Sequence, residues 1–188
     1  LSWSDKAGAA LFQSVSARTA GFNSVDIGSL SLASLFLLIL LMFVGGSPGS
    51  CAGGVKTTTA AIWIARLGCR LVGRSDTIMF GRTIPVEIVR KVSVVLALSL
   101  IWNTIGVLFL LATEAGAGAM HDVVFEQFSA FGTVGLSTGL TPKLSSLGKI
   151  WIIFTMFVGR LGPLTVALWM LRTEEEKVIY PDVKVMIG

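Results

Sequence analysis

The sequence contains an internal duplication at a constant offset of 114 residues. Each copy places a short Thr-x-Gly turn before a long apolar segment. Ten identical pairs at this offset are Gln13/Gln127, Thr19/Thr133, Gly21/Gly135, Leu30/Leu144, Ser31/Ser145, Ile39/Ile153, Met42/Met156, Phe43/Phe157, Val44/Val158 and Gly45/Gly159. A fixed period without gaps predicts a fold built from two copies of one unit.

The composition places these units in a lipid bilayer. Hydrophobic residues make up 53% of the chain and charged residues only 14%, whereas roughly a quarter of the residues in soluble domains are charged. The basic residues are not interleaved with aromatic residues on a polar face, which argues against nucleic-acid binding. Cys51 and Cys69 are the only two cysteines, too few for a disulfide framework.

Each Thr-x-Gly turn follows a segment that is helical in pattern but too short to cross a membrane. Residues 5–18 and 120–132 predict these two helices, and neither can span a hydrocarbon core of about 30 Å. A half-length helix followed by a non-helical turn is the order of a re-entrant pore helix and its filter. Such backbone is tolerated at membrane depth only where protein or water satisfies its polar groups.

The two turns are the candidate ion-binding sites, because a filter replaces the water around a cation with backbone carbonyl oxygens. Glycine can take a positive φ, which lets successive carbonyls point the same way. Either turn alone is weak evidence, since helices commonly end in turns, but the duplication favours a filter. The predicted ion-binding residues are Thr19, Ala20, Gly21 and Phe22 in the first copy and Thr133, Val134, Gly135 and Leu136 in the second.

The apolar segment after the first turn is interrupted by a glycine-rich stretch. A continuous helix from residue 30 to residue 66 would be about 55 Å long, which exceeds the membrane core. We therefore expect two half-helices joined by a loop, over residues 45–54, at membrane depth or at its inner edge. Five glycines make this loop flexible: Gly45, Gly46, Gly49, Gly53 and Gly54.

Two further segments complete the predicted topology. Residues 92–112 carry no charge and predict a membrane-spanning helix, and residues 147–171 predict a second one. Arg160 is placed near the middle of the second helix, too deep to reach the membrane surface, so it should face the protein interior. The basic stretch before residue 92 is cytoplasmic by the positive-inside rule. Both turns then lie on the outer side.

These features divide the chain into four parts. Residues 1–67 predict a pore unit that has a pore helix, a filter and a broken helix but lacks a leading spanning helix. Residues 68–91 predict a cytoplasmic basic linker. Residues 92–171 predict a complete unit, and residues 172–188 a cytoplasmic tail. Because the first unit has no counterpart of 92–112, the chain is expected to be a fragment that cannot conduct ions alone.

Both turns carry a family resemblance. Residues 16–23, Ser-Ala-Arg-Thr-Ala-Gly-Phe-Asn, resemble the third filter of the Trk/Ktr/HKT superfamily of potassium transporters, and residues 133–137, Thr-Val-Gly-Leu-Ser, resemble the fourth. The chain is most similar to the C-terminal half of a KtrB-type membrane subunit. The implied fold class is an all-α membrane protein, with four units of helix, pore loop and helix (M1–P–M2) around one filter.

The resemblance implies roles that the residues alone do not show. The glycine-rich loop would be a gate beneath the filter, contacted by Arg160, which would repel cations there. The implied activity is potassium (K+) uptake across a bacterial plasma membrane. The complete subunit would be a homodimer in contact with lipids, with sodium (Na+) as a possible activator and a cytosolic nucleotide-binding ring of the KtrA or TrkA type as regulator. No covalent cofactor and no catalytic residue is expected.

Two alternatives belong to other functional classes. A membrane-embedded enzyme requires a polar catalytic cluster at depth, and the sequence offers none. A non-conducting assembly or scaffold subunit has no need for special turns and would tolerate bulky residues at Gly21 and Gly135. Potassium and sodium are not distinguished by the residues alone.

Overall fold

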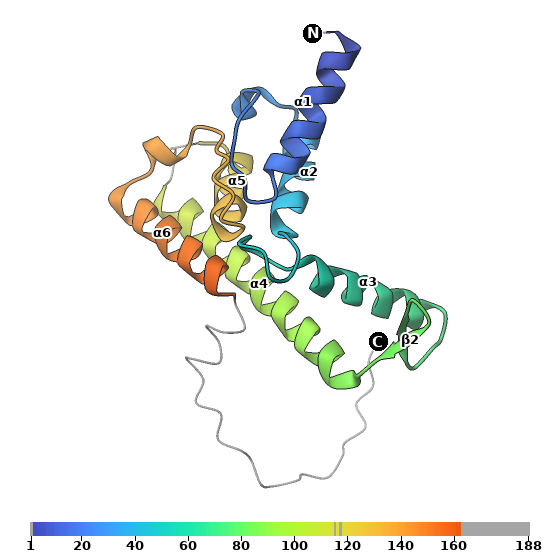
Figure 1. Cartoon of the computed structure of the whole chain (residues 1–188). Helices are drawn as coiled ribbons and strands as arrows, with labels where there is room; N and C mark the ends of the chain where they lie inside the picture. Colours follow the sequence, from blue (N-terminus) through green and yellow to red (C-terminus); the bar gives the residue numbers. More distant parts are fainter. Residues whose placement is uncertain (1, 115, 117, 163–188) are drawn as a thin grey trace, which may run out of the picture.

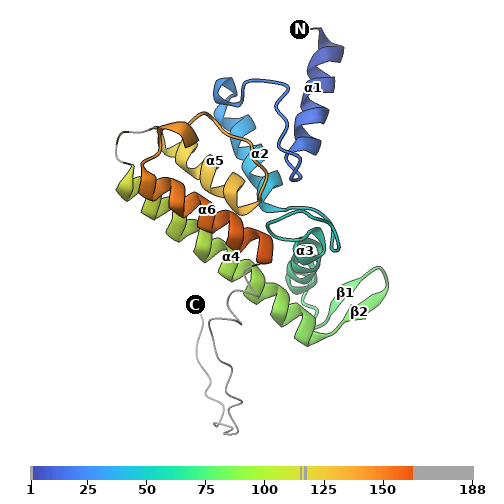
Figure 2. The same ribbon diagram turned by 60° about the vertical axis from the view of Figure 1, so that its left-hand side comes forward.

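The computed structural model describes residues 2–114, 116 and 118–162, and its α-helices and strands are labelled in Figure 1 and Figure 2. The order of α1, η1 and α2 in the first half is repeated by α5, η2 and α6 in the second. The elements are α1 Trp3–Ser16, η1 Ile27–Ser29, α2 Leu32–Phe43, α3 Thr57–Leu71, β1 Thr77–Met79, β2 Arg82–Ile84, α4 Val86–Thr113, α5 Met120–Phe131, η2 Thr141–Lys143 and α6 Ser146–Leu161.

The two predicted half-length helices are confirmed as α1 and α5. A reciprocal capping box starts α1, in which the Ser2 hydroxyl accepts from the Asp5 amide and the Asp5 carboxylate accepts from the Ser2 amide. At the start of α5, Asp122 accepts from the amide of Ala119 at 3.1 Å. A carboxylate in the first turn also complements the positive end of the helix dipole.

Helix α5 lies at the centre of the second half and contributes to two hydrophobic clusters. Phe125 packs in a cluster with residues of α2 and with Val134 and Leu136 of the second turn, whereas Val123 packs with residues of α4 and α6. Figure 1 shows α5 beside α6 and α4, with α2 on its other side. This placement brings the end of α5, where the second turn begins, close to the first half of the chain.

The predicted break after α2 is confirmed. Helices α2 and α3 point in different directions in both Figure 1 and Figure 2, and residues 44–56 connect them. The connection folds back on itself, because Val44 and Val55 form a parallel bridge and the amide of Gly45 donates to the carbonyl of Val55 at 2.8 Å. The loop is therefore ordered backbone that closes on its own ends.

The predicted linker, residues 68–91, contains regular structure that the sequence did not predict. It includes the end of α3, the antiparallel hairpin of β1 and β2, and the start of α4. Phe80 and Gly81 form the two-residue turn, with φ values of 50° and 74°. Two positive φ values in succession are typical of a type I′ hairpin turn.

The two predicted spanning helices have different outcomes. Within the described residues, α4 is the one helix both long and apolar enough to cross a membrane, and it begins earlier than predicted. Helix α6 ends at Leu161, because Gly162 takes a φ of 87°, so a single helix over 147–171 is wrong. Arg160 consequently lies in the last turn of α6 and not at mid-helix. Residues 163–171 and the predicted tail, 172–188, lie outside the described residues.

Candidate ion-binding site

The two Thr-x-Gly turns lie directly against each other. A Cβ atom built on Gly135 would lie 3.9 Å from the Cα of Gly21, and one built on Gly21 would overlap the carbonyl oxygen of Val134. The turns that the duplication pairs in sequence are thus neighbours in space, and Gly21 has no room for a side chain larger than hydrogen.

Both turns repeat the same unusual backbone conformation. Thr19 and Gly21 have φ values of 67° and 74°, and Thr133 and Gly135 have φ values of 50° and 91°. The sequence predicted positive φ for the glycines but not for the threonines. For a β-branched residue this region is a true outlier, which costs about 1–3 kcal/mol. Because both copies keep this conformation, we regard the strain as a property of the site.

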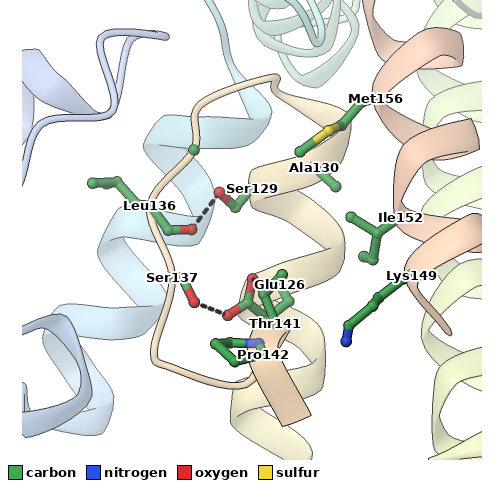
Figure 3. A pocket seen from close by; sticks show the side chains of 11 residues that line it. Glu126, Ser129, Ala130, Leu136, Ser137, Thr141, Pro142, Lys149, Ile152 and Met156 are labelled. Atoms are coloured by element: carbon green, nitrogen blue, oxygen red, sulfur yellow. Dashed lines mark hydrogen bonds between the residues drawn. The ribbon is translucent and has the colours of Figure 1, made fainter. Parts of the chain in front are cut away.

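Serine side chains anchor each turn to its own pore helix. The Ser16 hydroxyl donates to the carbonyl of Phe22 at 2.6 Å, and the Ser129 hydroxyl donates to the carbonyl of Leu136 at 2.6 Å (Figure 3). These bonds direct the carbonyls of Phe22 and Leu136 back toward the helices. The role of Phe22 and Leu136 as ion ligands stays a prediction, since a carbonyl oxygen that accepts one hydrogen bond keeps a second lone pair.

The remaining backbone oxygens of the turns accept no hydrogen bond from the described residues. Among the described residues, no donor reaches the carbonyls of residues 19–21 or 133–135. The carbonyls of Phe22 and Leu136, which follow them, do accept hydrogen bonds. Ala20 and Gly135 are also exposed in this chain. The six unpaired carbonyls belong to Thr19, Ala20, Gly21, Thr133, Val134 and Gly135.

The glycine-rich loop packs beneath the second turn. A Cβ atom built on Gly53 would lie 2.9 Å from the carbonyl oxygen of Gly132, and one built on Gly54 would lie 3.4 Å from the Cα of Gly132. Gly45 packs with similar tightness on Gly53, and Gly46 on the side chains of Ser50 and Ala52. Gly49 is different, because it has open space around it and a φ of 82°.

Two cationic side chains bind three successive carbonyls of this loop. Arg160 donates to the carbonyl of Cys51, so its predicted contact with the loop is present. Lys56 donates to the carbonyls of Ala52 at 2.5 Å and of Ser50 at 3.4 Å. The contact of Lys56 was not predicted, because a lone lysine in the sequence carries no signal of it.

The ligands available at the site are oxygens of the peptide backbone. No group of three or more His, Cys, Asp or Glu side chains gathers in the part of the chain that the structure describes. Two opposed turns with unpaired carbonyls can therefore hold a weakly bound cation but offer nothing to a tightly held transition metal.

Comparison with known proteins decides the family. The model of the TrkH family, described as cation transport protein, matches residues 2–179. The chain belongs to the TrkH family. The TrkH family is one of membrane-embedded cation transporters and not of enzymes. The predicted Trk/Ktr membership is thus confirmed, and so is the mainly helical membrane fold.

Similar proteins are considerably longer than this chain. Ktr system potassium uptake protein B of Bacillus subtilis (strain 168) is 42% identical over 184 residues, which are 98% of this chain and 41% of that protein. Potassium/sodium uptake protein NtpJ of Enterococcus hirae is 40% identical over 187 residues, 94% of this chain and 40% of that protein. The crystal structure of the potassium transporter TrkH from Vibrio parahaemolyticus aligns with a TM-score of 0.69 and 26% identity, over 91% of this chain and 38% of that one.

Proposed function

We propose that this TrkH-family chain supplies two of the four pore units of a potassium uptake protein. In this proposal the turns at 19–21 and 133–135 form two sides of a selectivity filter, and residues 45–54 form the gate beneath it. The filter faces the outside of a bacterial plasma membrane, and the hairpin of β1 and β2 faces the cytoplasm.

One observation carries the proposal: two duplicated turns oppose each other while six of their carbonyl oxygens accept no hydrogen bond from the described residues. Backbone oxygens buried in a protein are nearly always paired with a donor from the protein or from water. Oxygens left free on opposed turns suit a cation that exchanges its water for them. Potassium is the favoured ion because two similar proteins are named for potassium uptake, one of them for sodium as well.

The proposed number of units is supported by an uncovered helix face in the first half. In the second half, α4 covers α5 and α6, with Gly106 against the side chain of Gln127 and Trp102 stacked on Trp151. On α1, the apolar side chains of Leu11 and Val15 are 69% and 62% exposed. We propose that a helix equivalent to α4 covers this face, and that two further units complete the ring.

In this mechanism a cation sheds water at the outer end of the turns and is held by their carbonyls. It then meets the loop, where Lys56 and Arg160 already occupy the carbonyls of residues 50–52. Two positive charges at this point repel a cation, so the loop must move before the ion enters the cytoplasm along its electrochemical gradient. The homodimer, the nucleotide-binding ring and the activation by sodium stay predictions.

The test uses a four-unit transporter that carries this chain, reconstituted in vesicles. Gly135→Ser is expected to lower the ratio of potassium to sodium transport about tenfold or more, because serine at positive φ distorts the turn. Gly73→Ser is the matched control, since Gly73 has a φ of 76° and open space around it but follows α3, away from both turns. An unaltered ratio in the Gly135 variant would favour the non-conducting scaffold subunit.

A further inference from the structure

A buried carboxylate lies directly behind the second turn. Glu126 of α5 is 4% exposed and accepts hydrogen bonds at both oxygens. Ser137 donates its hydroxyl to Oε1, and Thr141 donates its hydroxyl to Oε2 at 2.7 Å. Both donors belong to the segment that follows the turn, so Glu126 ties this segment to the pore helix. The proposed filter and gate make no use of this residue.

Glu126 and the anchor Ser129 act on neighbouring residues of the turn. They are three residues apart on α5 and therefore lie on the same face of the helix. Ser129 holds the carbonyl of Leu136, and Glu126 holds the next side chain, that of Ser137, as Figure 3 shows. Both residues line a cavity of about 450 Å³ that also reaches Gly135 of the turn. The space behind the turn is thus open, and two bonds to α5 span it.

The first half of the chain has the serine anchor but lacks the carboxylate. Ser16 holds the carbonyl of Phe22 as Ser129 holds that of Leu136. Three residues before Ser16 stands Gln13, which has no partner among the described residues, whereas three residues before Ser129 stands Glu126. We call the two bonds from Ser137 and Thr141 to Glu126 the clamp. Among the described residues, the second turn has this clamp and the first does not.

The charge on Glu126 makes this clamp strong. Hydrogen bonds to an ionised acceptor are roughly twice as strong as neutral ones, and a buried carboxylate that loses its donors is costly. No described Lys or Arg forms an ion pair with Glu126; Lys149 lines the same cavity but is exposed. The two hydroxyls therefore carry its stabilisation.

We propose that Glu126 is a positioning residue that sets the preference of the second turn for potassium over sodium. It fixes Ser137 and Thr141, and through them the distance of residues 133–136 from α5. A turn held at this distance keeps its oxygens spaced for the larger ion, whereas a released turn closes around the smaller one. This inference rests on the proposed role of the turns as an ion filter.

The experiment compares Glu126→Gln with Glu114→Gln in the reconstituted four-unit transporter. Glu114 is the matched control because it is also a buried carboxylate, 8% exposed, and it accepts from the amide of Ser145 at 2.9 Å and from its hydroxyl, away from the turns. We expect Glu126→Gln to lower the ratio of potassium to sodium transport about tenfold, because glutamine keeps one acceptor and loses the charge. Glu126→Asp should recover part of the ratio, and Glu114→Gln should leave it unchanged.

Gly135→Ser, measured in the same vesicles, distinguishes a failure of the proposed ion filter from a failure of the proposed role of Glu126. If Gly135→Ser lowers the ratio and Glu126→Gln does not, the role of Glu126 is overturned while the filter stands. If neither variant changes the ratio, the filter itself is overturned. Should Glu126→Gln fail to reach the membrane, Thr141→Val removes one donor from a half-buried position, and an unchanged ratio in that variant overturns the clamp.

Discussion

The hydroxyl of Thr19 donates a hydrogen bond of 3.1 Å to the carbonyl oxygen of Gly132, and this bond ties the first turn to the root of the second. It crosses between the two copies of the duplicated unit. Thr19 also has a positive φ. Its side chain therefore bonds to the second turn while its backbone adopts the strained conformation of the first.

Thr19→Val keeps the β-branched shape and removes this bond, so it should lower the free energy of unfolding by about 1 kcal/mol. The measurement is thermal unfolding of the purified transporter in detergent. Thr104→Val is the control, since the hydroxyl of Thr104 bonds only to Leu100 within its own helix. Equal melting temperatures for the two variants would show that the bond between the turns contributes nothing.

Gly53→Ala should displace the glycine-rich loop, because the added methyl group would overlap backbone of Gly132 and the side chain of Thr133. Overpacking of this kind costs about 1–3 kcal/mol. We expect a lower melting temperature together with altered potassium uptake. Gly68→Ala in α3 meets no atom within 4 Å and should be neutral or slightly stabilising. A Gly53 variant that behaves like the Gly68 variant would contradict the packing of the loop under the turn.

Lys56→Gln should loosen the loop, because it removes the charge that holds the carbonyls of Ser50 and Ala52. We expect potassium flux to rise several-fold, and Cys51, an exposed free cysteine in this loop, to react faster with a thiol reagent.

The experiment has three controls. Cys69 serves as the internal reference for labelling. Lys56→Arg should behave as the parent, and Lys6→Gln controls for loss of charge. Unchanged flux with unchanged Cys51 labelling would show that the bonds of Lys56 do not hold the loop closed.

Glu114 predicts a dependence of stability on pH. The hydroxyl of Ser145, and next its backbone amide, hold the pKa of Glu114 below its usual value of 4.5. A lowered carboxyl pKa stabilises the folded state above pH 4.5, and this stabilisation is lost as the pH falls through the lower pKa of the folded state. The difference in melting temperature between the parent and Glu114→Gln should therefore be largest near neutral pH and shrink in acid. A difference that is constant across this range would contradict the assignment.

The sequence predicted the parts of the fold that depend on periodicity and on glycine. The half-length helices α1 and α5 and the break after α2 follow from patterns that tertiary contacts do not override. The duplication also paired the two turns correctly, because identical residues at one offset fold into one kind of unit. The end of α6 is also marked in the sequence, because Gly162 precedes Pro163 and a Gly-Pro pair is typical of a turn after a helix.

Other features depend on contacts that no local pattern encodes. The anchors Ser16 and Ser129 are offset by 113 residues and not by 114, so a search for identical residues at the repeat offset misses them. The positive φ of Thr19 and Thr133 runs against the preference of threonine and is imposed by the contacts between the turns. The bonds of Glu126 join residues that only the folded turn brings together.

The most direct test of the ion filter is to locate the ion. Crystals of a four-unit transporter carrying this chain, soaked with thallium or rubidium as potassium substitutes, should show anomalous density about 3 Å from the carbonyls of Ala20, Gly21, Val134 and Gly135. Density at these oxygens, lost in Gly135→Ser, is the result that our interpretation predicts. Well-ordered turns with no ion between them, or with these carbonyls directed into lipid, would contradict it.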